Sequence, residues 1–351
     1  MTRALKTRVC ELLDASYPIL QTGMGWVATP ELTAAACDAG AFGFLAAATI
    51  PPEEVEAAIL RVKALTERPF GVNFLMDAPG ADVISEAIIR QGVKAAGYNR
   101  APSAELIQRL KDAGVVCVPT CGAVKHAVKA AKLGADIVIV QGGEGGGHTG
   151  NTPTSLLVSA CVDAVSVPVV AAGGFHDGRG LVAALAFGAE GIAMGTRFLL
   201  TRESPVPEIT TDRYLAASVD DVIRTTQIDG MPQRVVMNEF VRSLEGKGPG
   251  ARLWLAFRNA FELRRITGAS VPALLRSGLA MRKNERLTRA QTLLAANAPI
   301  LTKRAMVDGD PVTGCLPSGS VTGMIEDRPT CDALVRRMVE EAERTLKALG
   351  A

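Results

Sequence analysis

A glycine-rich stretch that contains one histidine, residues 141–150 (Gln-Gly-Gly-Glu-Gly-Gly-Gly-His-Thr-Gly), carries the clearest chemical signal in the sequence. Six of its ten residues are glycine, and glycine lets the backbone approach a flat ligand and point N–H groups at it. Histidine is the side chain most often used for proton transfer near neutral pH, so His148 is a candidate general acid or base. The alternative is a loop histidine that only orders its own turn. The glycine context favours the catalytic interpretation.

Two further small-residue stretches, Ala171–Gly174 and Met194–Arg197, follow the last two of eight predicted strands. Loops after the seventh and eighth strands of a parallel barrel commonly hold a phosphate group on free backbone N–H groups. Two ordinary turns are the plain alternative. Because both stretches occur together, we expect a phosphate cradle from Gly173, Gly174, Gly195 and Thr196.

Other predicted strands also end in residues that suit a ring-shaped ligand. Gln21–Trp26 (Gln-Thr-Gly-Met-Gly-Trp) places an apolar methionine between two glycines, although a methionine beside glycine is more often a core residue. Amide and hydroxyl side chains at three other strand ends can hydrogen-bond a ring edge. The candidates from this group are Gly23, Met24, Gly25, Asn73, Thr120 and Gln141.

Lys125 lies in the first turn of a predicted helix, Ala123–Leu133, where its charge opposes the helix dipole. It is equally consistent with an ordinary exposed lysine and with a group that reaches an anionic substrate. Cys117 and Cys121 are four residues apart, but no second Cys or His pair accompanies them. We therefore expect buried strand-end thiols and no metal site.

The elements that must position these residues alternate as eight strand–helix units. The predicted strands are Pro18–Gly23, Phe42–Ala47, Pro69–Leu75, Val93–Asn99, Val115–Cys121, Ile137–Gly142, Val167–Gly173 and Gly191–Phe198. Amphipathic stretches such as Pro52–Thr66 and Ser103–Ala113 separate them. Eight units predict an α/β fold of the (β/α)8 TIM-barrel type, with its site at the carboxyl ends of the strands. An open doubly wound sheet is the alternative, but no GxGxxG follows the first strand.

The pattern changes near Asp212, where helical segments follow one another and predict an α-helical cap inserted after the eighth strand. We therefore expect a barrel over 1–211, a cap over 212–310, and a C-terminal segment over 311–351 whose helix Thr330–Leu349 returns to the barrel. The predicted cap helices are Gln233–Leu244, Ala251–Ile266, Val271–Leu279 and Thr288–Ala296.

Composition excludes several other classes of protein. The formal net charge of +2 is too small to indicate a nucleic-acid binder. No apolar run reaches about 18 residues and no secretory signal begins the chain, so neither a membrane span nor export is expected. Seven cysteines, an odd number at scattered spacings, suit a reducing cytoplasm. Residues 212–310 carry 16 Lys and Arg against 10 Asp and Glu, a surplus that either faces an anionic ligand or coats solvated helices.

Together these motifs resemble the nitronate monooxygenase (2-nitropropane dioxygenase-like) family of FMN barrels. The resemblance rests on Gln21–Trp26, Pro69–Asn73, the His148 loop, Ala172–Gly180 and Met194–Phe198. It implies His148 as the catalytic group. It also implies FMN held by Gly23, Met24, Asn73, Gln141, Gly146, Gly173, Gly174, Gly195 and Thr196. The family includes nitronate monooxygenases, NAD(P)H:quinone reductases and FMN-dependent enoyl reductases.

Stretches in the second half, Ile228–Val235, Gly278–Arg282 and Ala295–Leu301, resemble a branch of the family that acts on CoA esters from steroid C/D-ring breakdown. Ser320 departs from the glutamine expected there, which puts a flavin contact from this position in doubt. A basic cap suits the phosphates of CoA, whereas nitronates are small and need no cap of nearly a hundred residues.

We therefore expect an FMN-dependent oxidoreductase for a ring-bearing acyl-CoA ester, with His148 as acid/base. The direction of the reaction, an NAD(P)H or other electron partner, and a homodimer stay open. The alternatives are a nitronate monooxygenase or quinone reductase with the same flavin site, and a non-catalytic barrel that senses a phosphorylated metabolite.

Overall fold

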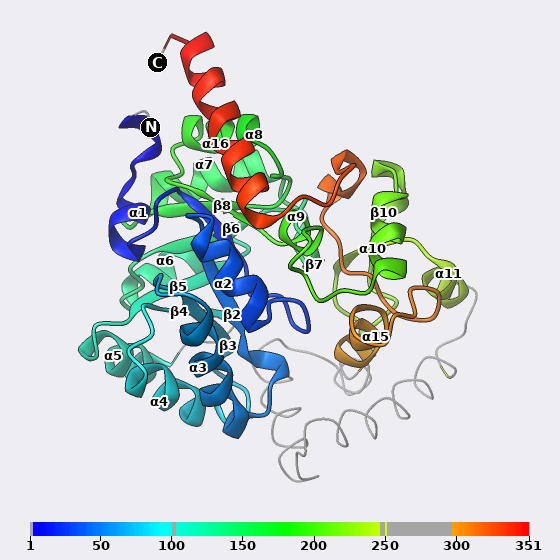
Figure 1. The fold of residues 1–351 in the computed structure, drawn as a ribbon, viewed down its shortest axis with the longest axis horizontal. Coiled ribbons are helices and arrows are strands. Elements are labelled where there is room, and N and C mark those ends of the chain that lie inside the picture. Colours follow the sequence, from blue (N-terminus) through cyan, green and yellow to red (C-terminus); the bar gives the residue numbers. More distant parts are fainter. Residues whose placement is uncertain (1–2, 100–102, 246–249, 251–296, 351) are drawn as a thin grey trace.

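Eight parallel strands close into a barrel in the order β1-β2-β3-β4-β5-β6-β8-β9 (Figure 1). The computed structural model describes residues 3–99, 103–245, 250 and 297–350. Pairing of β1 with β9 closes the ring and excludes the open sheet, so the predicted (β/α)8 fold is confirmed. The barrel strands are β1 Ile19–Gln21, β2 Phe42–Ala46, β3 Gly71–Leu75, β4 Ala95–Asn99, β5 Val116–Cys121, β6 Val138–Gln141, β8 Val169–Ala172 and β9 Ile192–Met194.

Helices follow most of the strands and form the outer layer. Several begin at a side-chain cap; Thr29, Ser103 and Asp177 each accept a hydrogen bond from a backbone N–H of the first turn. The helices of this layer are α2 Pro30–Asp38, α3 Val55–Leu65, α4 Ala81–Arg90, α5 Ala104–Asp112, α6 Val124–Lys132, α7 Thr154–Ala164 and α8 Gly178–Ala186. The C-terminal helix α16, Cys331–Ala348, packs against α8 and α2. It corresponds to the helix predicted over Thr330–Leu349.

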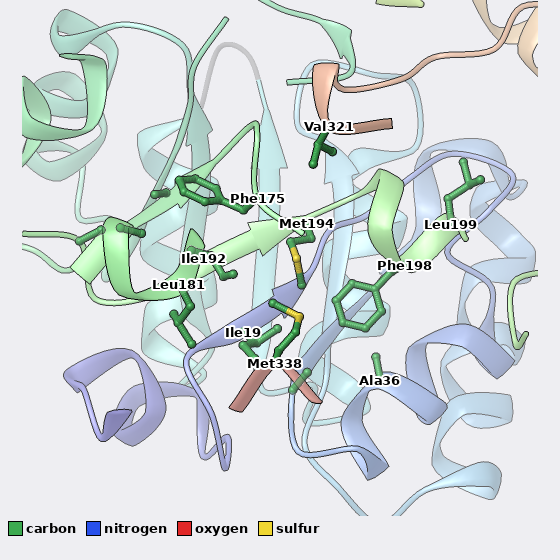
Figure 2. Close-up of a cluster of buried hydrophobic side chains, with 14 of the residues drawn as sticks. Ile19, Ala36, Phe175, Leu181, Ile192, Met194, Phe198, Leu199, Val321 and Met338 are labelled. Carbon is green, nitrogen blue, oxygen red and sulfur yellow. The ribbon is translucent and has the colours of Figure 1, made fainter. Parts of the chain in front are cut away.

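The barrel interior is filled by apolar side chains, so it is a packed core below the strand ends. Leu20, Phe42 and Val170 belong to this interior cluster, and Val9 and Leu13 of helix α1 (Arg8–Leu13) join it. A second cluster connects the barrel wall to later parts of the chain. Figure 2 shows its members from β1, β9, α9 (Thr196–Leu199), the C-terminal tail and α16: Ile19, Met194, Phe198, Leu199, Val321 and Met338.

The chain after the barrel contains strands as well as helices. Its described elements are α10 Glu208–Leu215, β10 Val222–Thr225, β11 Gln233–Val236, α11 Glu239–Glu245 and α15 Asn297–Met306, most of them grouped beside the barrel in Figure 1. β11 pairs antiparallel with β10 and with β7, the two-residue strand Gly147–His148. The segment therefore attaches directly to the glycine-rich loop.

Two sequence predictions are wrong at this point. The helix predicted over Gln233–Leu244 begins only at Glu239, because Gln233–Val236 forms strand β11 between two partner strands; tertiary pairing outweighs its helical pattern. The strand predicted over Gly191–Phe198 ends at Met194, and the following apolar residues pack as the short helix α9. The predicted helices Ala251–Ile266, Val271–Leu279 and Thr288–Ala296 lie outside the described residues.

All seven cysteines are buried and free. Cys117 and Cys121 are buried as predicted, and burial raises the pKa of both thiols to about 12. Across the described ranges, no three His, Cys, Asp or Glu side chains gather as a metal site. No helix in the same ranges is long and apolar enough to cross a bilayer.

A buried arginine ties the end of the barrel to the tail. Arg197 of α9 is 2% exposed and reaches Asp327 Oδ1 at 3.0 Å with Nη1. Its Nη2 donates to the carbonyl oxygens of Asp327 and Leu200 at 2.9 and 3.1 Å. Burial lowers the pKa of the Arg197 guanidinium. Arg337 of α16, half-exposed, reaches the same carboxylate at 2.7 Å.

Replacing Asp327 with alanine is expected to cost about 2 kcal/mol of unfolding free energy, because it leaves the buried Arg197 charge with only carbonyl oxygens as partners. Arg337→Ala removes only the exposed partner and is expected to cost about 0.5 kcal/mol. Urea unfolding followed by circular dichroism measures both values. Equal losses in the two variants would contradict this account of the pair.

Candidate active site

A cavity of about 460 Å³ opens at the carboxyl ends of the barrel strands, a size typical of small-molecule and cofactor sites. His148 lines it, and so does each of the candidate ligand residues of the sequence. These are Gly23, Met24, Gly25, Asn73, Thr120, Gln141, Gly146, Gly173, Gly174, Gly195 and Thr196. The strand ends thus bring together residues that are up to 173 positions apart in the chain.

The rim after β8 and β9 suits an anionic group. Gly173 and Gly174 have φ of 100° and 85°, values that favour glycine. A Cβ on Gly173 would lie 2.8 Å from the nitrogen of Gly145. The backbone N–H groups of Gly173, Gly174 and Gly195 donate to no backbone carbonyl oxygen among the described residues. Free N–H groups at adjacent strand ends fit a phosphate.

The neighbouring side of the cavity, at the loop after β1, is glycine-lined for steric reasons. A Cβ on Gly23 would lie 2.4 Å from Cβ of Asn73, so the loop after β1 can pack against the end of β3 only with glycine there. Met24 Sδ lies 3.2 Å from the position that a Cβ on Gly195 would take. These close approaches show that the loops pack tightly at this rim and leave little room for a side chain at Gly23 or Gly195.

His148 is paired with a buried carboxylate. Its Nε2 lies 2.6 Å from Oδ2 of Asp229, whose side chain is fully buried, while the imidazole is half-exposed at the cavity. Asp229 Oδ1 accepts a hydrogen bond from the Met231 N–H at 3.0 Å, which orients the carboxylate. When Nε2 donates its proton to Asp229, Nδ1 carries the free lone pair of the neutral ring. The pair has the arrangement of an oriented general base.

Asp229 was not identified from the sequence as a site residue. It lies 81 positions after His148 and beyond the predicted barrel. The one available signal was an acidic residue within Ile228–Val235, the stretch that resembles the CoA-ester branch. The pairing of β7 with β11 brings Asp229 to His148, and this pairing cannot be predicted from either segment alone.

Several contacts hold the histidine loop in place. Gln141 Nε2 donates to the carbonyl oxygens of His148 and Gly146 at 3.0 and 3.3 Å. Arg234 of β11 donates through Nε and Nη2 to the carbonyl oxygen of Gly143 at 3.0 and 2.8 Å. Since both ends of the loop are bonded, the imidazole has a defined position at the rim.

The C-terminal tail crosses the same rim before it reaches α16. Gly319 N–H donates to Thr196 Oγ1 at 3.0 Å, and Ser320 N–H donates to the Glu144 carbonyl oxygen at 2.9 Å. The tail therefore joins the end of β9 to the histidine loop. Ser320 makes its contact through the backbone, which its departure from glutamine leaves intact.

Helix α15 covers the side of the cavity next to the loop after β1. Its residues Ala298, Pro299, Thr302 and Met306 line the cavity. Trp26 Nε1 donates to the carbonyl oxygen of Pro299 at 3.2 Å, and Trp26 has a φ of 67°, unusual for a bulky side chain. Strain of this kind concentrates at functional sites.

Lys125 does not join the site. It is exposed at the start of α6 and is not among the residues that line the cavity. Two lining residues that sequence reasoning missed are Asn99 and Gln233, whose buried Oδ1 and Nε2 atoms have no hydrogen-bond partner among the described residues. A single sequence carries no signal for such unpaired atoms.

Known proteins match this chain in both sequence and fold. The family model described as nitronate monooxygenase matches residues 6–95 and 86–341. An enzyme of Rhodococcus jostii named (3aS,4S,5R,7aS)-5-hydroxy-7a-methyl-1-oxo-octahydro-1H-indene-4-carboxyl-CoA dehydrogenase is 49% identical over 347 residues, 99% of this chain and 98% of that protein. A Mycobacterium tuberculosis enzyme of the same name is 48% identical and covers 99% of each chain.

Among solved structures, FabK from Thermotoga maritima superposes with a TM-score of 0.79 at 30% identity, over 98% of both chains. The family match spans nearly the whole chain, including both the barrel and the tail that crosses its rim. The chain belongs to the nitronate monooxygenase family.

Proposed function

We propose that this protein is an FMN-dependent oxidoreductase that acts on a ring-bearing acyl-CoA ester from the breakdown of the steroid C and D rings. The observation that carries the chemistry is the His148–Asp229 pair at the rim of a glycine-lined cavity. The substrate class is supported by the names of the Rhodococcus and Mycobacterium relatives, which align with this chain from end to end.

FMN fits the cavity on two structural grounds. The free N–H groups at Gly173, Gly174 and Gly195 suit its phosphate, and the unpaired buried atom of Asn99 suits a polar ring edge. The remaining ligands that we propose are Gly23, Met24, Gly25, Asn73, Thr120, Gln141, Gly146 and Thr196. When bound, the flavin supplies exchange of a hydride with a carbon of the substrate.

The chain's own residues supply the proton chemistry. The thioester acidifies the adjacent C–H, and His148 removes that proton in the oxidative direction or returns it in the reductive one. Asp229 holds the imidazole by Nε2 and stabilises its protonated form. Both relatives are named dehydrogenases, which favours oxidation of the ester and transfer of electrons to an external acceptor such as NAD(P)⁺.

We further propose that residues 212–310 are the substrate-binding part of the chain, set between the barrel of 1–211 and the returning segment 311–351. Their surplus of six positive charges, 16 Lys and Arg against 10 Asp and Glu, suits the phosphates of CoA. α15, within this range, already lines the cavity next to the proposed flavin site.

The first test is removal of the acid/base. His148→Ala is expected to lower kcat by about 10²- to 10⁴-fold while FMN stays bound, because proton transfer loses its carrier and the rim glycines are untouched. Anaerobic loss of flavin absorbance on mixing with the indene-carboxyl-CoA ester measures the rate. His126→Ala, an exposed histidine on α6 outside the cavity, is the matched control. Full activity in His148→Ala would overturn the proposed role.

The phosphate cradle has its own prediction. Gly173→Ala is expected to weaken FMN binding by about tenfold or more, because its φ of 100° disfavours a side chain and its Cβ would press on Gly145. Gly92→Ala is the control, since Gly92 also has a positive φ but nothing within 4 Å of a Cβ. Equilibrium dialysis measures the FMN affinity of the two variants, and equal affinities would contradict the assignment of the phosphate site to this rim.

The substrate class is tested by comparing the turnover rates of different substrates. The CoA ester is expected to reduce the bound flavin without oxygen, and faster than alkyl nitronates drive oxygen uptake. Turnover faster with nitronates would reassign the site to nitronate oxidation, and turnover faster with quinone and NAD(P)H would reassign it to quinone reduction. Ligand binding without flavin turnover by any donor would indicate a sensor.

A further inference from the structure

Gln233 carries an unsatisfied hydrogen-bond donor inside the proposed active site. The residue is 2% exposed and lines the cavity. Its Nε2 is buried and has no hydrogen-bond partner among the described residues. A buried amide donor without a protein acceptor costs free energy unless a water or a ligand supplies the acceptor.

The β7–β11 pairing places this donor beside the acid/base. Gln233 and His148 are direct cross-strand partners in an antiparallel pair. Side chains of directly opposed residues leave the same face of the sheet, with Cβ atoms about 5 Å apart. Because His148 also lines the cavity, both side chains lie at the same cavity.

The amide donor of Gln141, the other glutamine that lines the cavity, is already used. Gln141 Nε2 donates to two carbonyl oxygens of the histidine loop, His148 and Gly146, and so stabilises the protein itself. Asn99 offers an unpaired oxygen, an acceptor, from the end of β4. Gln233 is therefore the lining amide whose free donor lies next to the group that moves the proton.

We propose that Gln233 Nε2 donates a hydrogen bond to the thioester carbonyl oxygen of the substrate and stabilises the enolate that forms when His148 removes the α-proton. In this step the α C–H bond breaks, its proton goes to the imidazole, and its electron pair becomes the C=C bond while charge moves to the oxygen. A hydrogen-bond donor aimed at the oxygen that gains charge lowers the activation barrier to proton removal. The inference rests on the proposed acyl-CoA substrate.

The test measures enolate formation separately from redox chemistry. The holoenzyme is incubated with the indene-carboxyl-CoA ester in D₂O without an electron acceptor, and deuterium entering the α-position is followed by mass spectrometry. Gln233→Met removes the donor at similar size and is expected to slow exchange by about 10²- to 10³-fold. The FMN dissociation constant and the thermal unfolding midpoint of Gln233→Met are expected to equal those of the unchanged protein.

Gln108→Met, on the exposed face of α5, is the matched control and is expected to exchange at the full rate. Gln233→Met with undiminished exchange would overturn the inference while leaving the proposed function intact. A weakened FMN affinity in Gln233→Met would also overturn it, because the donor would then belong to the cofactor. Absence of both exchange and flavin reduction in the unchanged protein would overturn the proposed function and the inference together.

Discussion

The pairing of the two-residue strand β7 with β11 is the contact on which the proposed site depends. It joins a glycine-rich loop of the barrel to a segment more than 80 residues later in the chain. Through it, Asp229 reaches His148 at 2.6 Å and Gln233 stands opposite the same histidine. Backbone hydrogen bonds between β7 and β11 fix the register of these residues. A shift by one residue would turn the Gln233 side chain to the other face of the sheet.

Barrel closure provides the second constraint. Parallel strands that close into a ring bring all their carboxyl ends to one rim, so short loops far apart in sequence surround one cavity. Glycine at the strand ends then allows close backbone approach, as at Gly23 and Gly173, where a Cβ would collide with a neighbour. The scaffold and the glycines act at different scales: one selects which loops meet, and the other shapes the surface that they form.

Sequence patterns predicted this part of the molecule well, because buried parallel strands read as short apolar runs and their last residues face the cavity. The glycines after β8 and β9 follow from that rule, and His148 was identified from the glycine-rich loop that contains it; all of them line the cavity. Asp229 and Gln233 were not identified in this way, since their roles arise from a pairing between β7 and β11 that neither segment's pattern contains. The helical pattern over Gln233–Leu244 even pointed the other way, and the partner strands decided the outcome for its first four residues. Lys125 shows the converse: its position in sequence was suggestive, but its helix turns it to solvent.

The central claim is that a flavin occupies the glycine rim with the Asp229-held imidazole facing the reacting atoms of the substrate. A crystal structure of the complex with FMN and an unreactive CoA-ester analogue tests it most directly. The account predicts the flavin phosphate against Gly173, Gly174 and Gly195, His148 still bonded to Asp229, and the thioester between His148 and Gln233. A flavin bound elsewhere, or an imidazole turned away to solvent with Asp229 bonded to another group, would contradict it.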